Sequence, residues 1–195
     1  MSASEPIIIN DGSKLSGKFL VATPQMLDPR FARAVIYICN HDKDGAMGLV
    51  INKTKDMPLS KMLNHIGIDG EVKVADSPVL SGGPVDTNRG FVLHSPDFKN
   101  LNNSLKLSDT LMMTSTKDVL ESLVADHAPD KAVLAVGYAG WSDGQLEREL
   151  QNNAWLVVDG DEALIFDTDM EGKWTKALSK IGVTPEMLSA TGGSA

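Results

Sequence analysis

The chain has 195 residues and a hydrophobic content of 42%, enough to bury the core of one domain. Its formal net charge of −8 excludes nucleic-acid binding driven by bulk electrostatics, which needs clustered lysines and arginines. The single cysteine, Cys39, excludes an intrachain disulfide and fits a reducing cytoplasm. We find no signal-peptide pattern and no run near the roughly 20 apolar residues of a membrane span, so we expect a cytoplasmic protein without a membrane partner.

The clearest local prediction is a β-hairpin. The apolar runs at residues 34–39 and 46–52 flank the sequence NHDKDG, in which Asp44-Gly45 supplies the turn chemistry. A strand at residues 18–24 precedes the hairpin and ends at a Thr-Pro pair, since the residue before proline favours extended geometry. Because Cys39 lies inside an apolar run, we expect a buried structural thiol there.

The rest of the chain predicts a mixture of strands and helices. Extended segments are expected at residues 77–94, 104–115, 131–140, 154–158 and 162–166. Helices are expected at residues 58–67, 117–127, 143–152, 173–182 and 184–190.

This order of elements predicts the fold class. Strands and helices do not alternate strictly, so a doubly wound parallel sheet is disfavoured and an α+β fold with a mostly antiparallel or mixed sheet is expected. There is no internal repeat and no evident linker, so we predict one domain over residues 1–195, with flexible tails at 1–14 and 190–195.

The stretch AVGYAGWSDGQLEREL (residues 135–150) resembles a glycine-rich phosphate loop, but its residues argue against one. No Lys-Ser/Thr pair follows the last glycine, and Asp143 and Glu147 would repel a phosphate at the helix start. Ser142 and Gln145 instead have the spacing of a capping box. Trp141 is left with two alternatives, packing in the core or lining a surface groove.

The sequence contains no strong motif for hydrolysis or metal binding. Ser81 lacks the glycine-flanked turn of a serine hydrolase, and Arg89 is expected in a structural ion pair. The histidines and Cys39 do not have zinc-ligand spacing, although folding could bring His41 near His94. We therefore predict no catalytic residue, no cofactor and no metal.

The negative charge is concentrated in one segment. Residues 141–171 contain nine acids and one base, so this segment alone accounts for −8. Two interpretations remain open: a solvated acidic face, or an acidic surface for a basic partner.

Three blocks of the sequence resemble the signature blocks of the YqgE/AlgH family. They are GKFLVATPQMLDPRFARAVIYICNHDKDGAMGLVIN, LSGGPVDTNRGFVLH and GYAGWSDGQLERELQNNAWL. The resemblance runs from about Gly17 to Ile181. One departure is Asn40, which precedes His41 where the family pattern has an acid.

The resemblance implies a bacterial, cytoplasmic protein with an AlgH-like fold, in which helices surround a bent mixed sheet that includes a small closed barrel. It also implies a role in transcriptional regulation, and it supplies no catalytic residue or cofactor. The exposed-prone polar positions shared with the family define a candidate binding surface: His41, Asn52, Arg89, His94, Trp141 and Gln145.

The residues and the resemblance together allow three functions. The first is a non-enzymatic regulatory protein that acts through a protein partner, because the charge disfavours direct DNA binding. The second is a sensor of a small anionic ligand, with Arg89 pairing with the anion and Trp141 stacking on a ring. The third is an enzyme of unknown class. The sequence leaves the oligomeric state open.

Overall fold

The computed structural model describes residues 15–98 and 103–191. The predicted tail at 1–14 and residues 192–195 lie outside this part of the chain. The last helix, α6, spans Pro185–Thr191 and so includes the first two residues of the predicted C-terminal tail.

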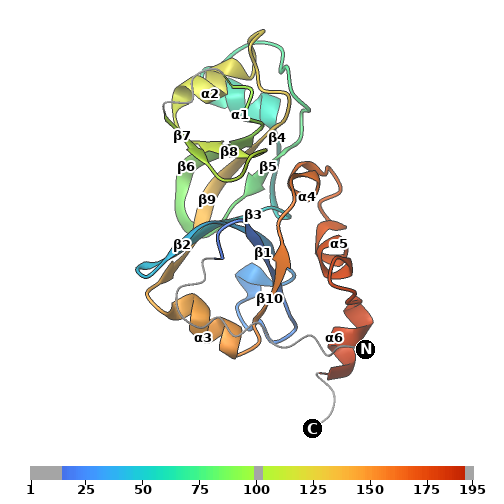
Figure 1. The fold of residues 1–195 in the computed structure, drawn as a ribbon. Coiled ribbons are helices and arrows are strands. Elements are labelled where there is room, and N and C mark those ends of the chain that lie inside the picture. Colours follow the sequence, from blue (N-terminus) through green and yellow to red (C-terminus); the bar gives the residue numbers. More distant parts are fainter. Residues whose placement is uncertain (1–14, 99–102, 192–195) are drawn as a thin grey trace.

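Four antiparallel strands form the lower half of the molecule in Figure 1. They are β1 (Lys18–Ala22), β2 (Val35–Asp42), β3 (Gly45–Val50) and β10 (Trp155–Asp159), in the order β10-β1-β2-β3. The predicted hairpin is confirmed as β2–β3, with Asp42 opposite Gly45 at the turn. Cys39 lies where the register of this hairpin shifts; it is buried, and burial raises the pKa of its thiol to about 12.

The upper half is built on shorter strands. They are β4 (Thr54–Pro58), β5 (Pro78–Ser81), β6 (Val85–His94), β7 (Ser104–Lys106) and β8 (Met112–Thr114). β9 (Ala132–Ser142) runs through both halves: its first part pairs with β5 and β6, and its last part pairs with β3. Most pairs are antiparallel, and β5–β9 is parallel.

The two halves meet at a close crossing of glycines. Gly82 donates its N–H to the carbonyl of Val136 and accepts a hydrogen bond from the N–H of Val50, both at 2.9 Å. A Cβ on Gly83 would lie 2.1 Å from the backbone carbon of Tyr138, and a Cβ on Gly137 would lie 2.4 Å from the carbonyl oxygen of Gly83. Gly137 also has a φ of +79°, which side chains rarely adopt. Only glycines allow the backbones to approach this closely.

The prediction of a mixed α+β fold is confirmed, but the small closed barrel is not. In the described residues the sheet follows the path β10-β1-β2-β3-β9-β6-β8-β7, with β10 and β7 at opposite ends. The sheet therefore curls without closing.

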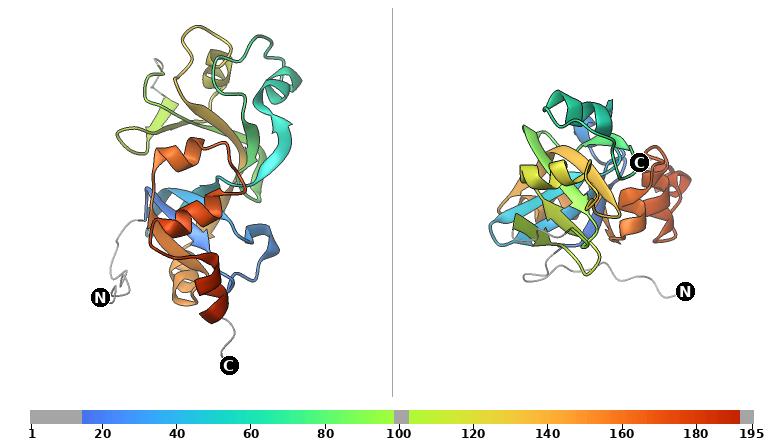
Figure 2. Two further views of the ribbon diagram at one scale, coloured as in Figure 1. Left: turned by 90° about the vertical axis from the view of Figure 1, so that its right-hand side faces the viewer. Right: turned by 90° about the horizontal axis from the view of Figure 1, so that it is seen from above.

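Helices cover three sides of this sheet. α1 (Leu59–His65) and α2 (Lys117–Ser122) pack on the upper half, and α3 (Gln145–Gln151) packs on the lower half. α4 (Glu162–Phe166), α5 (Lys173–Ser179) and α6 follow one another along one side, as Figure 2 shows in orange and red. Among the described helices, none is long and apolar enough to cross a membrane.

One predicted strand is wrong. Residues 162–166 form the helix α4, because Asp161 caps it by accepting a hydrogen bond from the N–H of Leu164 at 2.7 Å. Leu164 and Ile165 are buried in this helix. A short apolar run of this kind is also typical of a buried strand, which is why the sequence pattern predicted one.

One core cluster runs through both halves. It joins Phe19 and Leu49 in the lower half to Leu80 and Phe91 in the upper half, and α5 covers one end of it with Trp174. A second cluster fills the space between the lower strands and α3, and a third fills the space between the upper strands and the helices α1 and α2.

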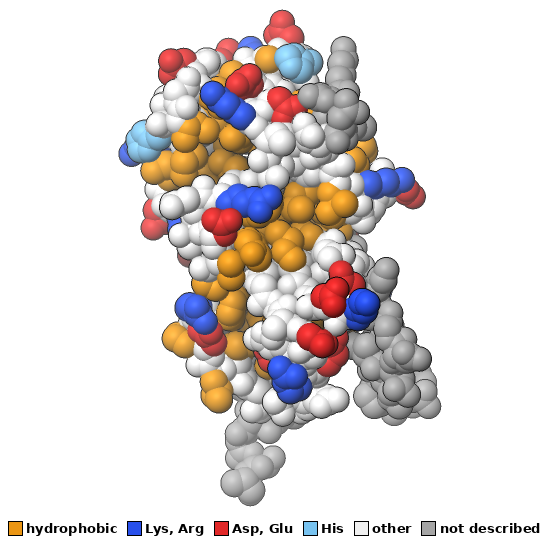
Figure 3. Space-filling view, turned by 90° about the vertical axis from the view of Figure 1, so that its left-hand side faces the viewer, with side chains coloured by type: hydrophobic (Ala, Val, Ile, Leu, Met, Phe, Trp, Pro, Cys, Tyr) orange, Lys and Arg blue, Asp and Glu red, His pale blue; other side chains and the backbone are white. Residues whose placement is uncertain are grey.

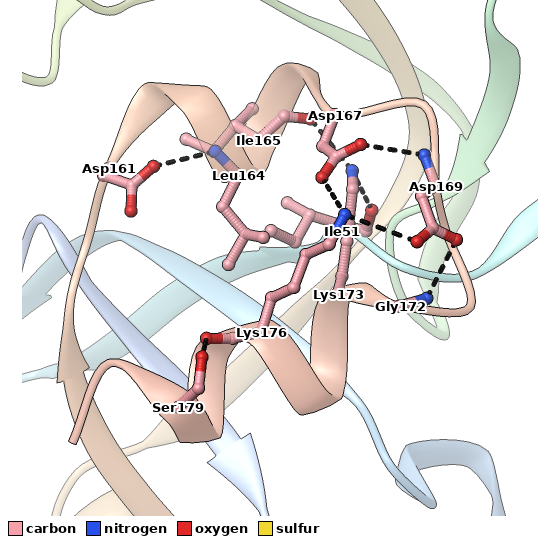
Figure 4. A network of polar contacts seen from close by, with 10 residues as sticks. All are labelled: Ile51, Asp161, Leu164, Ile165, Asp167, Asp169, Gly172, Lys173, Lys176 and Ser179. Atoms are coloured by element: carbon pink, nitrogen blue, oxygen red, sulfur yellow. Dashed lines mark hydrogen bonds and ion pairs between the residues drawn. The ribbon is translucent and has the colours of Figure 1, made fainter. Parts of the chain in front are cut away.

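Lys173 lies at the start of α5, next to Trp174 of the first cluster, and is fully buried. Figure 4 shows its polar contacts. Its Nζ donates to the carbonyl oxygens of Ile51 at 2.8 Å and Ile165 at 2.9 Å, so one amine ties α4 and α5 to the residue after β3. Burial lowers the pKa of Lys173 to about 8, and the neighbouring Asp167 opposes this change. Asp167 itself pairs with Lys176 at 2.6 Å.

Lys173→Met should change how stability depends on pH. The pKa of Lys173 falls from its ordinary value of 10.5 to about 8 on folding, so between these values the unfolded chain binds more protons than the folded chain. The free energy of unfolding of the wild type should therefore rise with pH relative to the variant, by up to about 1.4 kcal/mol per pH unit. Urea unfolding from pH 7 to pH 11 measures this difference.

Lys176→Met is the matched control. The hydrogen bond with Asp167 raises the pKa of Lys176, so its contribution to stability is lost as pH rises, and the difference curve should slope in the opposite direction. Parallel curves for the Lys173→Met variant and the wild type would contradict the buried amine.

Candidate functional site

An open hollow of about 700 Å³ lies over the last part of β9, and we call it the β9 hollow. It opens at the end of the first core cluster that α5 does not cover, because Met47, Phe91, Met113 and Tyr138 line it and also pack on that cluster. The lining residues come from the β2–β3 hairpin, β6, β8 and β9: Asn40, Asp42, Asp44, Gly45, Ala46, Met47, Val85, Arg89, Phe91, Met113, Tyr138, Gly140 and Trp141.

One of the residues that line the hollow is a glycine, Gly140. Met47 lies opposite Gly140 and Val85 lies opposite Tyr138, so these four residues share one face of the sheet. A Cβ on Gly140 would meet only the ring of Tyr138 at 3.4 Å and Val85 at 4.0 Å, which are ordinary contacts. The backbone would therefore accept a side chain at position 140. Because the residue is a glycine, that space is left open.

Two projecting segments form the walls of the hollow. One is the tip of the β2–β3 hairpin, which carries Asp42 and Asp44. The other is a bulge in β6: Val85 and Gly90 lie opposite Tyr138 and Val136, so the four residues 86–89 lie opposite the single residue Gly137, and all four are exposed.

Arg89 ends this bulge. Its guanidinium lies 5.1 Å from the centre of the Phe91 ring, a cation–π contact, and among the described residues it makes no ion pair. The predicted structural ion pair of Arg89 is therefore wrong. Figure 3 shows hydrophobic side chains gathered across the middle of this face, with charged side chains beside them.

A second hollow of about 570 Å³, which we call the α3 hollow, lies on the other side of Trp141. It shares Val85, Gly140 and Trp141 with the first. The remaining lining residues are Met26, Asp28, Arg30, Phe31, Pro84, Gln145, Arg148, Glu149 and Asn152. Both alternatives for Trp141 hold: its side chain packs edge-on against Trp155 with ring centres 6.3 Å apart, and it borders both hollows.

Glu149, on α3, collects three N–H donors. The indoles of Trp141 and Trp155 donate to Oε1 at 3.4 and 3.2 Å, and the amide of Gln145 donates to Oε2 at 3.2 Å. This carboxylate therefore fixes two tryptophans and one glutamine of the α3 hollow. The family pattern identified Trp141 and Gln145 but not the acid that positions both.

Gln145 also forms half of the predicted capping box. Its Oε1 accepts from the N–H of Ser142 at 3.1 Å, whereas the Ser142 hydroxyl donates to the same oxygen instead of capping the helix. Gly144, with a φ of +71°, occupies the N-cap position.

His41 is buried against α3. Its Nδ1 accepts from the N–H of Leu15 at 3.0 Å, so in its neutral form the ring carries its hydrogen on Nε2, which donates to Glu147 at 2.7 Å. Burial raises the pKa of Glu147, but hydrogen bonds from its own N–H and from His41 outweigh burial, and the pKa is lowered. The Nε2 of His41 therefore joins β2 to α3, and its Nδ1 joins β2 to Leu15, which precedes β1.

Asn52 and His94 lie elsewhere in the structure. The side chain of Asn52 bridges the N–H of Val35 and the carbonyl of Arg33, which holds the left-handed Arg33 before β2. His94 is fully buried in the upper half, between the Ser95 carbonyl and the Thr114 hydroxyl, each at 2.7 Å. Burial lowers the pKa of His94 and outweighs the opposing effects of Ser95 and Asp97.

The six predicted residues therefore do not form one surface. Arg89 and Trp141 line the β9 hollow, and Trp141 and Gln145 line the α3 hollow. Gly140 and Tyr138 were not among the predicted residues, although their alternation in the apolar run of β9 could have placed them on one face. In the described part of the chain, no group of three or more His, Cys, Asp or Glu side chains is arranged to hold a metal ion.

Part of the acidic segment is paired with lysines of the same chain. Asp159 pairs with Lys18, Asp161 with Lys180, and Asp167 with Lys176. These three lysines offset part of the negative charge that the sequence concentrates at residues 141–171, and Glu147 and Glu149 accept hydrogen bonds from neutral groups within the fold.

Glu149→Ala should destabilise the fold by about 2 kcal/mol, because two half-buried indole N–H groups would lose their acceptor. Glu149→Gln keeps one acceptor oxygen and should lose less. Urea unfolding followed by tryptophan fluorescence measures both effects. Glu171→Ala, at an exposed position, is the control and should leave stability unchanged; equal midpoints for all four proteins would contradict this role.

Comparison with known proteins identifies the family. The model of the family described as "DUF179: AlgH-like" matches residues 19–186. A UPF0301 protein of Caulobacter vibrioides is 47% identical over 188 residues, covering 95% of this chain and 96% of the relative. A UPF0301 protein of Ruegeria pomeroyi is 47% identical over 182 residues, covering 93% and 99%.

Comparison with solved structures also identifies the AlgH fold. The solution structure of the AlgH protein from Pseudomonas aeruginosa is 38% identical, covers all of both chains and superimposes with a TM-score of 0.75. A crystal structure of a protein from Corynebacterium diphtheriae, 22% identical with a TM-score of 0.69, covers 89% of this chain and 90% of that one and shares the fold. Sequence and structure agree, and the chain belongs to the AlgH-like family.

Proposed function

We propose that this protein is a non-enzymatic, cytoplasmic regulatory protein of transcription that acts by binding a protein partner at the β9 hollow. The observation that carries the proposal is the hollow itself. It is wide and open, its floor is apolar, and polar side chains of two projecting segments surround it. An apolar centre with a polar rim is the ordinary build of a protein–protein interface.

The state of the candidate catalytic groups supports a binding role. Both ring nitrogens of His41 hold structural partners, and His94 is buried with both of its nitrogens bonded. A general base needs a free ring nitrogen within reach of a substrate. With a net charge of −8, the chain is better suited to a protein partner than to DNA.

A small anionic ligand at Arg89 and Trp141 is the second candidate. It is favoured by the guanidinium of Arg89, which has no carboxylate partner among the described residues. The carboxylates of Asp42 and Asp44 line the same hollow and oppose an anion, so we rank this candidate below a protein partner.

Site-specific photo-crosslinking in the native host tests the proposal. A photo-reactive amino acid replaces Val85, which is 39% exposed at the hollow, or Ile181, which is 42% exposed after α5 and serves as the matched control. Position 85 should give a discrete adduct with one protein that position 181 does not give, as read by mass spectrometry. Thermal unfolding confirms that both variants are folded.

Identical adducts at both positions, or none at position 85, would contradict the proposed interface. A small molecule that stays bound to the wild type and is lost in Arg89→Ala would favour the second candidate. Native mass spectrometry of the purified chain detects it.

A further inference from the structure

We propose that His41 is a pH-sensitive switch, which releases Leu15 from β2 when its ring gains a proton and keeps β2 joined to α3. The inference does not depend on the proposed function. It follows from the geometry of one buried ring, whose two nitrogens have hydrogen-bond partners of opposite kinds.

The partner of Nδ1 can only donate. The backbone N–H of Leu15 donates to Nδ1 at 3.0 Å, and an N–H group has no lone pair with which to accept. In a protonated imidazole both ring nitrogens carry hydrogen, so the Nδ1–H would face the N–H of Leu15. Because two facing donors cannot bond, protonation of the ring breaks the contact and Leu15 must move away.

The partner of Nε2 responds in the opposite way. Glu147 accepts from Nε2 at 2.7 Å, and its lowered pKa keeps it a carboxylate in the pH range where histidines titrate. Protonation of the ring converts this hydrogen bond into a charge-assisted one, which is stronger. The same proton therefore weakens the attachment of β2 to Leu15 and strengthens its attachment to α3.

The charges around His41 leave Glu147 as its direct partner. The charged residues on the neighbouring elements are Lys18 on β1, Asp42, Lys43 and Asp44 at the hairpin tip, and Glu147, Arg148 and Glu149 on α3. β3 and β9, which bring Ala46 and Trp141 beside His41, carry no charged residue. Among the residues that the structure describes, Glu147 is the charged group bonded to the ring.

The release is confined to Leu15, because the next contacts along the chain do not titrate. The backbone N–H of His41 donates to the Ser16 hydroxyl at 3.0 Å, and the N–H of Gly17 donates to the carbonyl of Ile38 at 2.8 Å. Leu15 itself is 4% exposed in the second core cluster. Its departure would uncover part of the cluster that lies between the lower strands and α3.

His94 shows why a buried histidine is not by itself such a switch. The partner of its Nε2 is the hydroxyl of Thr114, which can accept as well as donate and which bonds in turn to the hydroxyl of Ser104 at 2.6 Å. These hydroxyls can reverse their hydrogen bonds without breaking them. The ring of His41 faces a backbone N–H, which cannot reverse.

Nuclear magnetic resonance of the ¹⁵N-labelled full chain between about pH 5 and pH 8 tests the switch. The ring signals of His41 should show Nδ1 without hydrogen at high pH and with hydrogen at low pH. Over the same range the exchange of the Leu15 amide with water, relative to an unfolded chain at the same pH, should rise about tenfold as one hydrogen bond is lost. The Gly17 amide is the internal control and should not change.

Two variants each keep one half of the hydrogen bonding of the ring. His41→Asn places an acceptor oxygen near the position of Nδ1 and should hold Leu15 at every pH. His41→Gln places an amide N–H near the position of Nε2, so it should keep Glu147 and leave Leu15 released at every pH. His127→Gln, at an exposed histidine, is the matched control and should keep the wild-type transition.

Three results would overturn the switch. They are a His41 ring that stays neutral down to pH 5, exchange of Leu15 and Gly17 that changes in parallel, and a release that persists in His41→Asn. The wild-type titration decides the question even if a variant does not fold, because it compares two amides of one sample.

Discussion

The fold depends on one steric constraint, the crossing of Gly82 and Gly83 with Gly137 where β9 passes from the upper half of the sheet to the lower half. At this point backbone atoms lie where a Cβ would be, with separations of 2.1 to 2.4 Å for the three glycines. The hydrogen bonds of Gly82 to Val50 and Val136 connect β3, the β5–β6 turn and β9. Because one strand serves both halves, the first core cluster runs continuously between them and the sheet can curl without closing.

The same strand also creates the candidate site, through a glycine of a different kind. Gly140 lies three residues beyond Gly137, where a side chain would fit, and its absence opens the core beside Tyr138. The hollow is therefore an uncovered end of the central core, whereas the other end is closed by α5 and the buried Lys173. Apolar surface left uncovered on a water-exposed face is unfavourable, which gives a partner segment a reason to bind there.

The sequence predicted local structure better than it predicted the site. The β2–β3 hairpin followed from Asp44-Gly45 and its flanking apolar runs, and the helix α5 lies within the predicted range 173–182. The helix α4 was not predicted, because residues 162–166 form a short apolar run typical of a strand and the capping role of Asp161 depends on the folded backbone. His94 and Asn52 were grouped with Arg89 because all three are polar and match the family pattern, but one is buried and the other holds a turn. Position in a motif cannot distinguish these roles, because they depend on contacts between residues far apart in the chain, such as Glu149 with Trp141 and Trp155.

Alanine substitution distinguishes Gly137, which the close crossing requires, from Gly140, where a side chain would fit. Gly137→Ala must place a Cβ against the carbonyl of Gly83 at a positive φ, so it should lower the free energy of unfolding by about 2 kcal/mol or more. Gly140→Ala meets only ordinary contacts and should leave stability within about 1 kcal/mol of the wild type, or raise it. Urea unfolding of the two variants beside the wild type gives both values. Equal losses at the two positions would contradict the distinction between a glycine that permits the crossing and a glycine that leaves the hollow open.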